Sequence, residues 1–226
     1  MISKLFRHIR RRLITKSGNR KKIFTNIYEE KIWGGESEAF YSGSGSHKKQ
    51  YVEPYVMFLK NFIAEHNVDS AVDLGCGDFN IGSQFAYSLN EYIGVDIVDN
   101  LIEHNNKEFS CKNVRFLCLD ICNDDLPDAN LCIIRQVLQH LKNNEIQLVI
   151  NNTKKYKYVL VTESVTKKEY VKSYNSDIED DRYTRPNHFS GVYLNEAPFS
   201  VECTIVNRID YNDTVELVTY LIEHTV

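Results

Sequence analysis

Residues 70–78 read Ser70-Ala71-Val72-Asp73-Leu74-Gly75-Cys76-Gly77-Asp78, a short apolar strand that runs into a Gly-x-Gly turn. Glycines let the backbone pass close to a ligand, and open α/β sheets bind their ligands at the carboxyl ends of the strands. The stretch therefore predicts a parallel sheet that binds an adenosine-containing ligand at this turn.

The segments around this stretch alternate between strand and helix patterns. The predicted strands are 70–74, 92–95, 114–119, 131–134 and 158–162, and the predicted helices are 51–66, 80–89, 100–107 and 143–151. Short apolar strands separated by helices indicate a sheet with helices on both faces. Two further strands, 201–209 and 214–222, follow with a tight connection and predict a closing antiparallel hairpin.

The bulk properties fit one globular domain. The chain has 226 residues, of which 42% are hydrophobic and 26% charged, and this length accommodates one α/β core. No apolar run is long enough to span a bilayer and the first residues lack the apolar region of a secretory signal, so we expect a cytoplasmic protein.

The six cysteines include no CxxC pair and mostly lie in or beside apolar runs. We expect reduced, largely buried thiols. A zinc site built on Cys118 and Cys122 is the alternative, but no second ligand pair stands at a suitable spacing.

Charge is concentrated at the N-terminus. Residues 1–22 hold nine basic and no acidic side chains, whereas the other residues carry 18 basic and 31 acidic groups, a net charge of −13. Apolar residues recur among the basic ones at helical spacing and predict an amphipathic helix on an anionic membrane surface, at the inner face of the membrane. A helix docked on its own acidic domain and a frayed tail remain open. We expect no nucleic-acid partner, because the acidic body repels phosphate.

Acids end three successive strands of the predicted sheet: Asp73, Asp96 and Asp120. A Gly-x-Gly turn alone also fits a nicotinamide dehydrogenase, but such a protein has a third glycine where this chain has Asn80. Asp96 is placed to accept hydrogen bonds from both ribose hydroxyls, and Asp120 to accept from an adenine amino group. Asp73 is placed to support the turn and the cationic end of an amino-acid-bearing cofactor.

On these residues, segment 70–164 resembles the class I S-adenosyl-L-methionine (SAM)-dependent methyltransferases. Asp73, Gly75 and Gly77 fall on the family's D-x-G-x-G motif, and residues 131–141 resemble the fourth-strand motif beside the methyl donor. The resemblance implies a Rossmann-like, mostly parallel seven-stranded sheet with a C-terminal antiparallel hairpin, and SAM as cofactor. It implies these cofactor-binding residues: Asp73, Gly75, Cys76, Gly77, Asp78, Asp96, Ile97, Asp120, Ile121 and Arg135.

A narrower resemblance involves the loop GGESEAFYSGSGS at 34–46, Arg185-Pro186-Asn187 and Ala197-Pro198-Phe199. These segments are similar to bacterial methyltransferases of surface-glycan gene clusters. The resemblance implies O-methylation of a sugar or phosphate-linked group of a capsule or lipopolysaccharide precursor, an acceptor that is small or a glycan, phosphorylated or nucleotide-linked. An RNA or protein methyltransferase and a non-catalytic partner subunit remain alternatives.

The chain departs from the general motifs at two positions. Phe79 makes the glycine loop bulkier than the family's, and Gln136 replaces an acid, so we expect no metal at the site.

The chemistry needs a base only if the acceptor is a hydroxyl. His140 is the first candidate, because imidazole is an effective base near neutral pH and the residue follows the fourth strand. Glu163, at the end of the fifth strand, is the second candidate. The alternative for both is a structural role.

Four further side chains are predicted to bind substrate: Trp33, Tyr41, Arg185 and His188. Arginine recognises phosphate through two parallel hydrogen bonds, and aromatic rings stack on sugars. Docking of the N-terminal arm and surface packing are the alternatives for these residues.

The chain is thus predicted to be a single methyltransferase domain. Its parts are a basic segment 1–22, an arm and Gly/Ser-rich lid 23–49, a SAM-binding core 50–164, a substrate-side insertion 165–199 and closing strands 200–226.

Overall fold

The computed structural model describes residues 20–178 and 184–225. These residues build one seven-stranded sheet with the order β3-β2-β1-β4-β5-β7-β6. The strands are β1 (Ser70–Leu74), β2 (Glu91–Asp96), β3 (Val114–Cys118), β4 (Leu131–Arg135), β5 (Tyr158–Thr166), β6 (Thr204–Asp210) and β7 (Val215–Glu223). The α-helices are α2 (Arg20–Glu29), α3 (Lys49–Glu65), α4 (Asp99–Phe109) and α5 (Asn143–Asn152).

The predicted fold class is confirmed. β1 to β5 pair in parallel, whereas β7 runs antiparallel to both β5 and β6. The strand order reverses between β1 and β4, so the chain connections that leave these two paired strands run in opposite directions, next to the glycine turn. Such a switch point is where open α/β sheets hold ligands.

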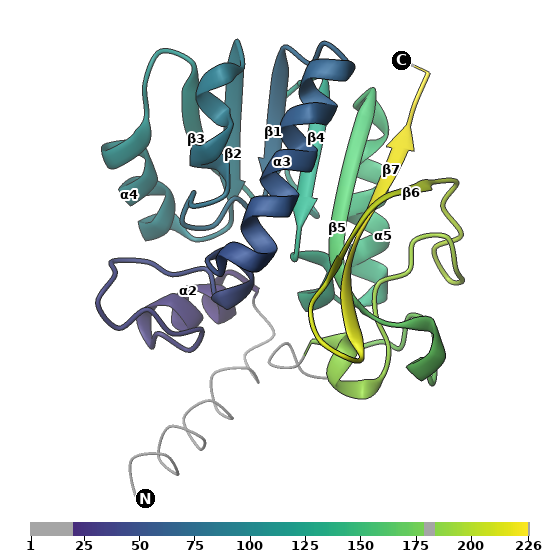
Figure 1. Cartoon of the computed structure of the whole chain (residues 1–226). Coiled ribbons are helices and arrows are strands. Elements are labelled where there is room, and N and C mark those ends of the chain that lie inside the picture. The colour runs from purple at the N-terminus through teal and green to yellow at the C-terminus, as the bar shows by residue number, and fades with distance from the viewer. Residues whose placement is uncertain (1–19, 179–183, 226) are drawn as a thin grey trace, which may run out of the picture.

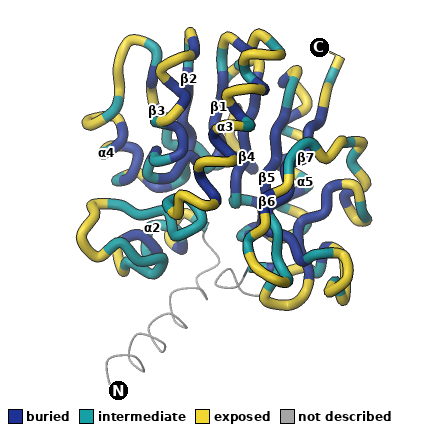
Figure 2. The backbone as a smooth tube through the Cα atoms, viewed as in Figure 1, coloured by how far each residue is buried: buried dark blue, intermediate teal, exposed yellow. Residues whose placement is uncertain are grey.

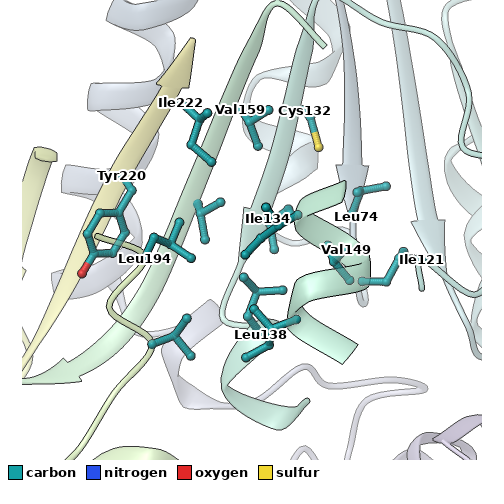
Figure 3. Packing of buried hydrophobic residues seen from close by; sticks show 14 of the residues in the cluster. Leu74, Ile121, Cys132, Ile134, Leu138, Val149, Val159, Leu194, Tyr220 and Ile222 are labelled. Atoms are coloured by element: carbon teal, nitrogen blue, oxygen red, sulfur yellow. The ribbon is translucent and has the colours of Figure 1, made fainter. Parts of the chain in front are cut away.

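Helices cover both faces of the sheet (Figure 1). Alternate residues of a strand point to opposite faces, and the two faces bury separate apolar clusters. In β4, Leu131 and Ile133 pack with α3 on one face, while Cys132 and Ile134 pack with α5 on the other. The segment after β5 covers the second face as well, through Val192 and its neighbours. Figure 3 shows side chains of this second cluster, and Figure 2 shows that the central strands of the sheet consist largely of buried residues.

The predicted helix at 80–89 is wrong. Two short 3-10 turns, Gly82–Gln84 and Ala86–Ser88, occupy this stretch. Ser88 donates its hydroxyl to the Phe85 carbonyl, and such local bonds compete with helical ones. A β-carbon at Gly82 would lie 2.5 Å from the Tyr92 hydroxyl, so the chain packs too closely here for an α-helix with side chains.

Phe79, which departs from the glycine of the general motif, keeps a glycine-like backbone. Its φ is 63° and its side chain is buried. The ring contacts Phe116 edge-on at 4.9 Å and Tyr92 at 5.4 Å. Aromatic burial thus stabilises a backbone conformation that costs a non-glycine residue about 1 kcal/mol or more.

Most of the predicted basic helix at 1–22 lies outside the described residues. At its described end, Arg20 bonds Asp120 and Lys21 lies 2.7 Å from Asp99. These pairs agree with the alternative of a segment docked on its own acidic domain. Within residues 20–178 and 184–225, no helix has the length and apolar character needed to cross a membrane.

All six cysteines are described and free, as expected for reduced thiols. Cys76, Cys122 and Cys132 are buried, whereas Cys111 is exposed. Cys118 lies beside Asp99 and Cys122 beside the Glu145 carbonyl, so the two thiols of the zinc alternative have different neighbours.

Candidate functional site

A cavity of about 390 Å³ opens at the carboxyl edge of the sheet. Its wall comes from α2, the Gly/Ser loop, the glycine turn, the ends of β2, β3 and β4, and the β6–β7 connection. Many of the predicted site residues line it: Trp33, Gly75, Gly77, Asp96, Ile97, Asp120, Ile121, Arg135 and His140. Segments far apart in the sequence therefore meet at one site.

The glycine turn has no room for side chains. Gly75 and Gly77 have φ of 84° and 56°, which L-residues rarely adopt. A β-carbon at Gly75 would lie 2.3 Å from Val137, and one at Gly77 would lie 2.3 Å from the Ser42 hydroxyl. The turn is therefore packed between the β4 turn and the Gly/Ser loop, with its backbone facing the cavity.

The Gly/Ser loop is docked on this turn. The Asp78 amide donates to the Ser42 hydroxyl (2.8 Å) while the Ser42 amide donates to the Asp78 carboxylate (2.7 Å). His47 lies 2.6 Å from the same carboxylate. Asp78 does not line the cavity, so the structure places it as the anchor of the predicted lid.

Two predicted cofactor residues lie behind the cavity wall. The buried Asp73 accepts a hydrogen bond from the Tyr92 hydroxyl (2.8 Å), and burial raises the pKa of its carboxyl to about 6. Cys76 is buried too, and burial raises the pKa of its thiol well above the usual value. Both residues support the turn from its protein side.

Asp96 lies in the cavity wall at the end of β2. Its two oxygens accept from the Gly77 and Val98 amides, both at 3.2 Å. Burial raises the pKa of Asp96 to about 6, against the opposing effect of these amides. The side chain is therefore held in a fixed position in the cavity wall, beside the glycine turn.

Asp120 is engaged by the protein itself. Its carboxylate accepts from Arg20 (2.6 Å), from the Asn123 side chain (2.8 Å) and from the Cys122 amide (3.0 Å). Burial acts to raise the pKa of Asp120, but the bond from Arg20 contributes to a net lowering. Arg20 also bonds Glu145 at the start of α5. The predicted adenine acid is thus paired with a residue that the sequence did not place in the site.

α2 roofs this part of the cavity. Arg20, Phe24 and Tyr28 line it at intervals of four residues, which is one face of a helix. Ile23 and Ile27, on the adjoining face, are buried. In the sequence, the interval of four between these residues was the available signal that α2 lines a cavity. The same interval fits a helix that packs on any apolar surface.

Arg135 is a buried cation at the end of β4. It donates to the Gly45 carbonyl and to the Gln136 side chain, both at 2.9 Å, and stacks over the Tyr55 ring. Its Nε has no hydrogen-bond partner, and none of the described carboxylates lies within ion-pair distance of it. Burial lowers the pKa of Arg135, so an anion bound in the cavity would compensate a desolvated charge.

The two base candidates occupy different positions. His140 lines the cavity, with Trp33 at 5.6 Å and Phe24 at 6.2 Å between ring centroids. Glu163 lies below the turn, completely buried, and accepts from the Val137, Leu138 and Gln139 amides at 3.0, 2.7 and 3.2 Å. Burial raises the pKa of Glu163 to about 7.

Of the predicted substrate residues, only Trp33 lines the cavity. Tyr41 stacks on His47 at 4.1 Å between ring centroids, away from the lining. Arg185 is 1% exposed and donates into the protein, and His188 is exposed outside the lining. The structure therefore places Arg185 as a packing residue, which was the alternative for it.

Beside Arg135, the half of the cavity opposite Asp120 is lined by neutral hydrogen-bonding side chains. They are Ser46, Gln136, Ser164, Thr184, Asn187, Tyr211 and Asn212. Among them, the sequence analysis singled out Gln136, and it included Ser46 and Asn187 in the segments that carry the narrower resemblance. Hydroxyl and amide residues in loops have no distinctive spacing, so only the tertiary contacts bring them together.

Known proteins resemble this chain in sequence and in fold. A family model described as a methyltransferase domain matches residues 65–203. A stretch of 85 residues is 32% identical to phosphoethanolamine N-methyltransferase 1 of Arabidopsis thaliana, covering 35% of this chain and 17% of that enzyme. The match therefore spans less than a fifth of that relative's length.

Two solved structures are similar to the chain. N-methyltransferase NodS from Bradyrhizobium japonicum WM9, in complex with S-adenosyl-L-homocysteine, has a TM-score of 0.60 at 14% identity, over 87% of this chain and 98% of that one. Magnesium protoporphyrin IX methyltransferase (ChlM) from Synechocystis PCC 6803, with bound SAM, has a TM-score of 0.55 at 13% identity, over 90% and 97%. At such identities the likeness concerns the fold.

Proposed function

The chain belongs to the methyltransferase-domain family, and on that premise we propose that it methylates a hydroxyl of a sugar or phosphate-linked group in a bacterial capsule or lipopolysaccharide precursor. The cofactor is SAM, which supplies the methyl group when bound. Both structural neighbours named above bind SAM or its demethylated product.

The residues of the cavity fit such a cofactor. The glycine turn presents backbone where a β-carbon would collide with its neighbours, and Asp96 beside it has the charge and burial suited to two ribose hydroxyls. Arg135, whose charge has no carboxylate partner among the described residues, is suited to the carboxylate of the cofactor's amino-acid part. Asp120 and Ile121 lie at the other end, where the adenine would lie.

One observation carries the choice of acceptor: apart from Arg135, the opposite half is lined by neutral hydrogen-bonding side chains. Amide and hydroxyl side chains reach it from the Gly/Ser loop, the β4 turn, β5, the segment after β5 and the β6–β7 connection. The described lining residues in this half include no carboxylate and no lysine. A wall of uncharged donors and acceptors matches a polyhydroxyl compound, because each sugar hydroxyl both donates and accepts.

The chain's own groups then have separate tasks. α2 and the Gly/Ser loop exclude water and hold the acceptor in line with the reacting carbon, the main source of rate in a displacement reaction. His140 accepts the proton that the acceptor hydroxyl loses, from its place in the wall beside Trp33 and Phe24. In this proposal, Asp96 and Arg135 at the ends of β2 and β4 bind the cofactor, whereas His140 in the turn after β4 removes the proton.

A methyl-transfer screen tests this proposal. Purified protein is incubated with SAM labelled in its methyl group and with nucleotide sugars, phosphorylated glycans, free sugars, phosphoethanolamine and RNA. Label in a sugar hydroxyl supports the proposal. Label only in an amine, as for the Arabidopsis relative's acceptor, or only in RNA overturns the acceptor class but not the family. SAM binding without transfer to any class would favour a partner subunit.

We also propose that residues 1–22 bring the enzyme to an anionic membrane from the cytoplasmic side. The support is their nine basic and no acidic side chains, next to a body of net negative charge.

A further inference from the structure

The turn between β4 and α5 carries five cavity-lining residues, among them the hydrogen-bonding side chains of Gln136 and His140. Gln136 has a φ of 56°, in the left-handed region, which costs a non-glycine residue about 1 kcal/mol or more. A residue in this region persists only where its surroundings enforce the conformation. The turn therefore needs contacts that hold it.

Glu163 supplies the contacts at the start of the turn. Three successive backbone amides, those of Val137, Leu138 and Gln139, donate to its two oxygens. The carboxylate is 0% exposed and lies outside the cavity lining. A buried carboxylate that accepts three amides fixes their direction, and so fixes the direction of the side chains that follow.

Arg185 supplies the contacts at the end of the turn. It donates to the Leu141 carbonyl (2.7 Å), the Asn143 side chain (2.8 Å) and the Ser176 carbonyl (2.6 Å). Its guanidinium thus joins the turn, the start of α5 and the segment after β5. Glu163 and Arg185 also attract each other, since each moves the pKa of the other toward its charged form.

We propose that Glu163 and Arg185 are positioning residues that hold the 136–141 turn from its two ends and thereby aim His140 and Gln136 at the acceptor. The inference rests on the proposed function. It removes Glu163 from the candidate bases, because its oxygens bond the turn and lie outside the cavity. It also gives Arg185 a role that its burial allows, unlike direct contact with a phosphate.

Core packing is the rival explanation for the order of the turn. Leu138 (Figure 3) is buried in the apolar cluster, as is Leu141, and both would anchor the turn without help from Glu163 or Arg185. Apolar contact is not directional, however, whereas three amides on one carboxylate specify an orientation. The two explanations therefore predict different effects of an isosteric change at Glu163.

The test uses Glu163→Gln and Arg185→Lys in the full chain, with Thr162→Val as control. Gln keeps the size of Glu but places its side-chain NH2 donor against one of the backbone N–H groups. Lys keeps the charge of Arg but lacks the several fixed N–H donors of the guanidinium. Thr162 is buried one residue before Glu163, and its hydroxyl bonds the Thr219 hydroxyl on β7. Its backbone carbonyl accepts the Gln136 amide at 2.7 Å, and the substitution keeps this contact because it changes the side chain alone. The control therefore perturbs the same strand equally deep in the core.

Two readouts are measured. Hydrogen exchange at the amides of residues 137–139, which needs no acceptor, should quicken at least tenfold in Glu163→Gln and stay unchanged in Thr162→Val. In the methyl-transfer assay kcat per folded molecule should fall roughly 10- to 100-fold in both test variants, as expected for a slight misplacement of reacting groups. The Kd for SAM should change less than threefold, and the double variant should lose less than the product of the single losses.

Three results would overturn the proposal: unchanged exchange in Glu163→Gln, faster exchange with normal kcat, or an equal loss of kcat in Thr162→Val. If the wild type transfers no methyl group at all, the proposed function fails. The exchange result still decides whether Glu163 holds the turn, so the two failures are distinguishable.

Discussion

Asp96 offers the sharpest test of the cofactor site. Its carboxylate ends β2 in the cavity wall and is held by the Gly77 and Val98 amides. Asp96→Asn keeps the size of the side chain and one accepting oxygen, whereas alanine would leave both amides without their partner. The change therefore removes the negative charge that we propose binds the ribose, and it replaces one of the two accepting oxygens by a donor.

The expected loss follows from the hydrogen bonds at stake. Bonds to a charged group contribute about 1.5–3 kcal/mol, so the Kd for SAM should rise about 10- to 150-fold. Titration calorimetry at about pH 8, where the wild-type carboxyl is ionised, measures this directly. The melting temperature of the variant should confirm that it is folded.

Asp69→Asn is the matched control. Asp69 is an exposed acid just before β1, at the opposite edge of the sheet, and this change removes one charge without touching the cavity. It should leave the Kd within twofold of the wild type. If folded Asp96→Asn binds SAM as tightly as Asp69→Asn, the ribose is held elsewhere and the assignment of Asp96 is refuted.

Four further predictions concern the same site. The affinity of the wild type for SAM should fall as the pH drops below about 6, because burial raises the pKa of Asp96 to about 6 and the protonated acid accepts hydrogen bonds poorly. Calorimetry across this pH range should show the fall in affinity, and Asp96→Asn should lack it. Arg20→Met should speed SAM association about two- to fivefold, because it frees Asp120 from a part-exposed ion pair. Stopped-flow fluorescence of Trp33, the single tryptophan, reports this rate. A slower association would show that Arg20 assists the entry of SAM. His140→Ala should lower turnover by roughly 10²–10⁴-fold with little change in SAM affinity, and normal turnover per folded molecule would exclude His140 as the base. Removing residues 1–19, which keeps the ion pairs of Arg20 and Lys21, should release the protein from anionic vesicles in co-sedimentation at low salt, while SAM binding persists. Equal sedimentation of both forms would contradict the membrane proposal.

The sequence alone was sufficient for the strands and the glycine turn. Short apolar runs and the spacing of Asp73, Asp96 and Asp120 along the chain reflect local chemistry, and strand ends in a parallel sheet meet at one edge. The helix predicted at 80–89 failed because Gly82 packs against Tyr92, a contact that no local pattern records.

The tertiary structure decided which of these residues face the cavity. Asp73 and Glu163 are strand acids like Asp96, but Asp73 lies one residue before the end of β1 and Glu163 lies inside β5, beyond the predicted end of that strand. Their carboxylates bond Tyr92 and three backbone amides inside the protein. Arg20 entered the site from a segment that the sequence marked only as basic. Composition and spacing determine which groups the chain can offer, but hydrogen bonds between distant segments determine whether a buried charge supports the protein or remains available to a ligand.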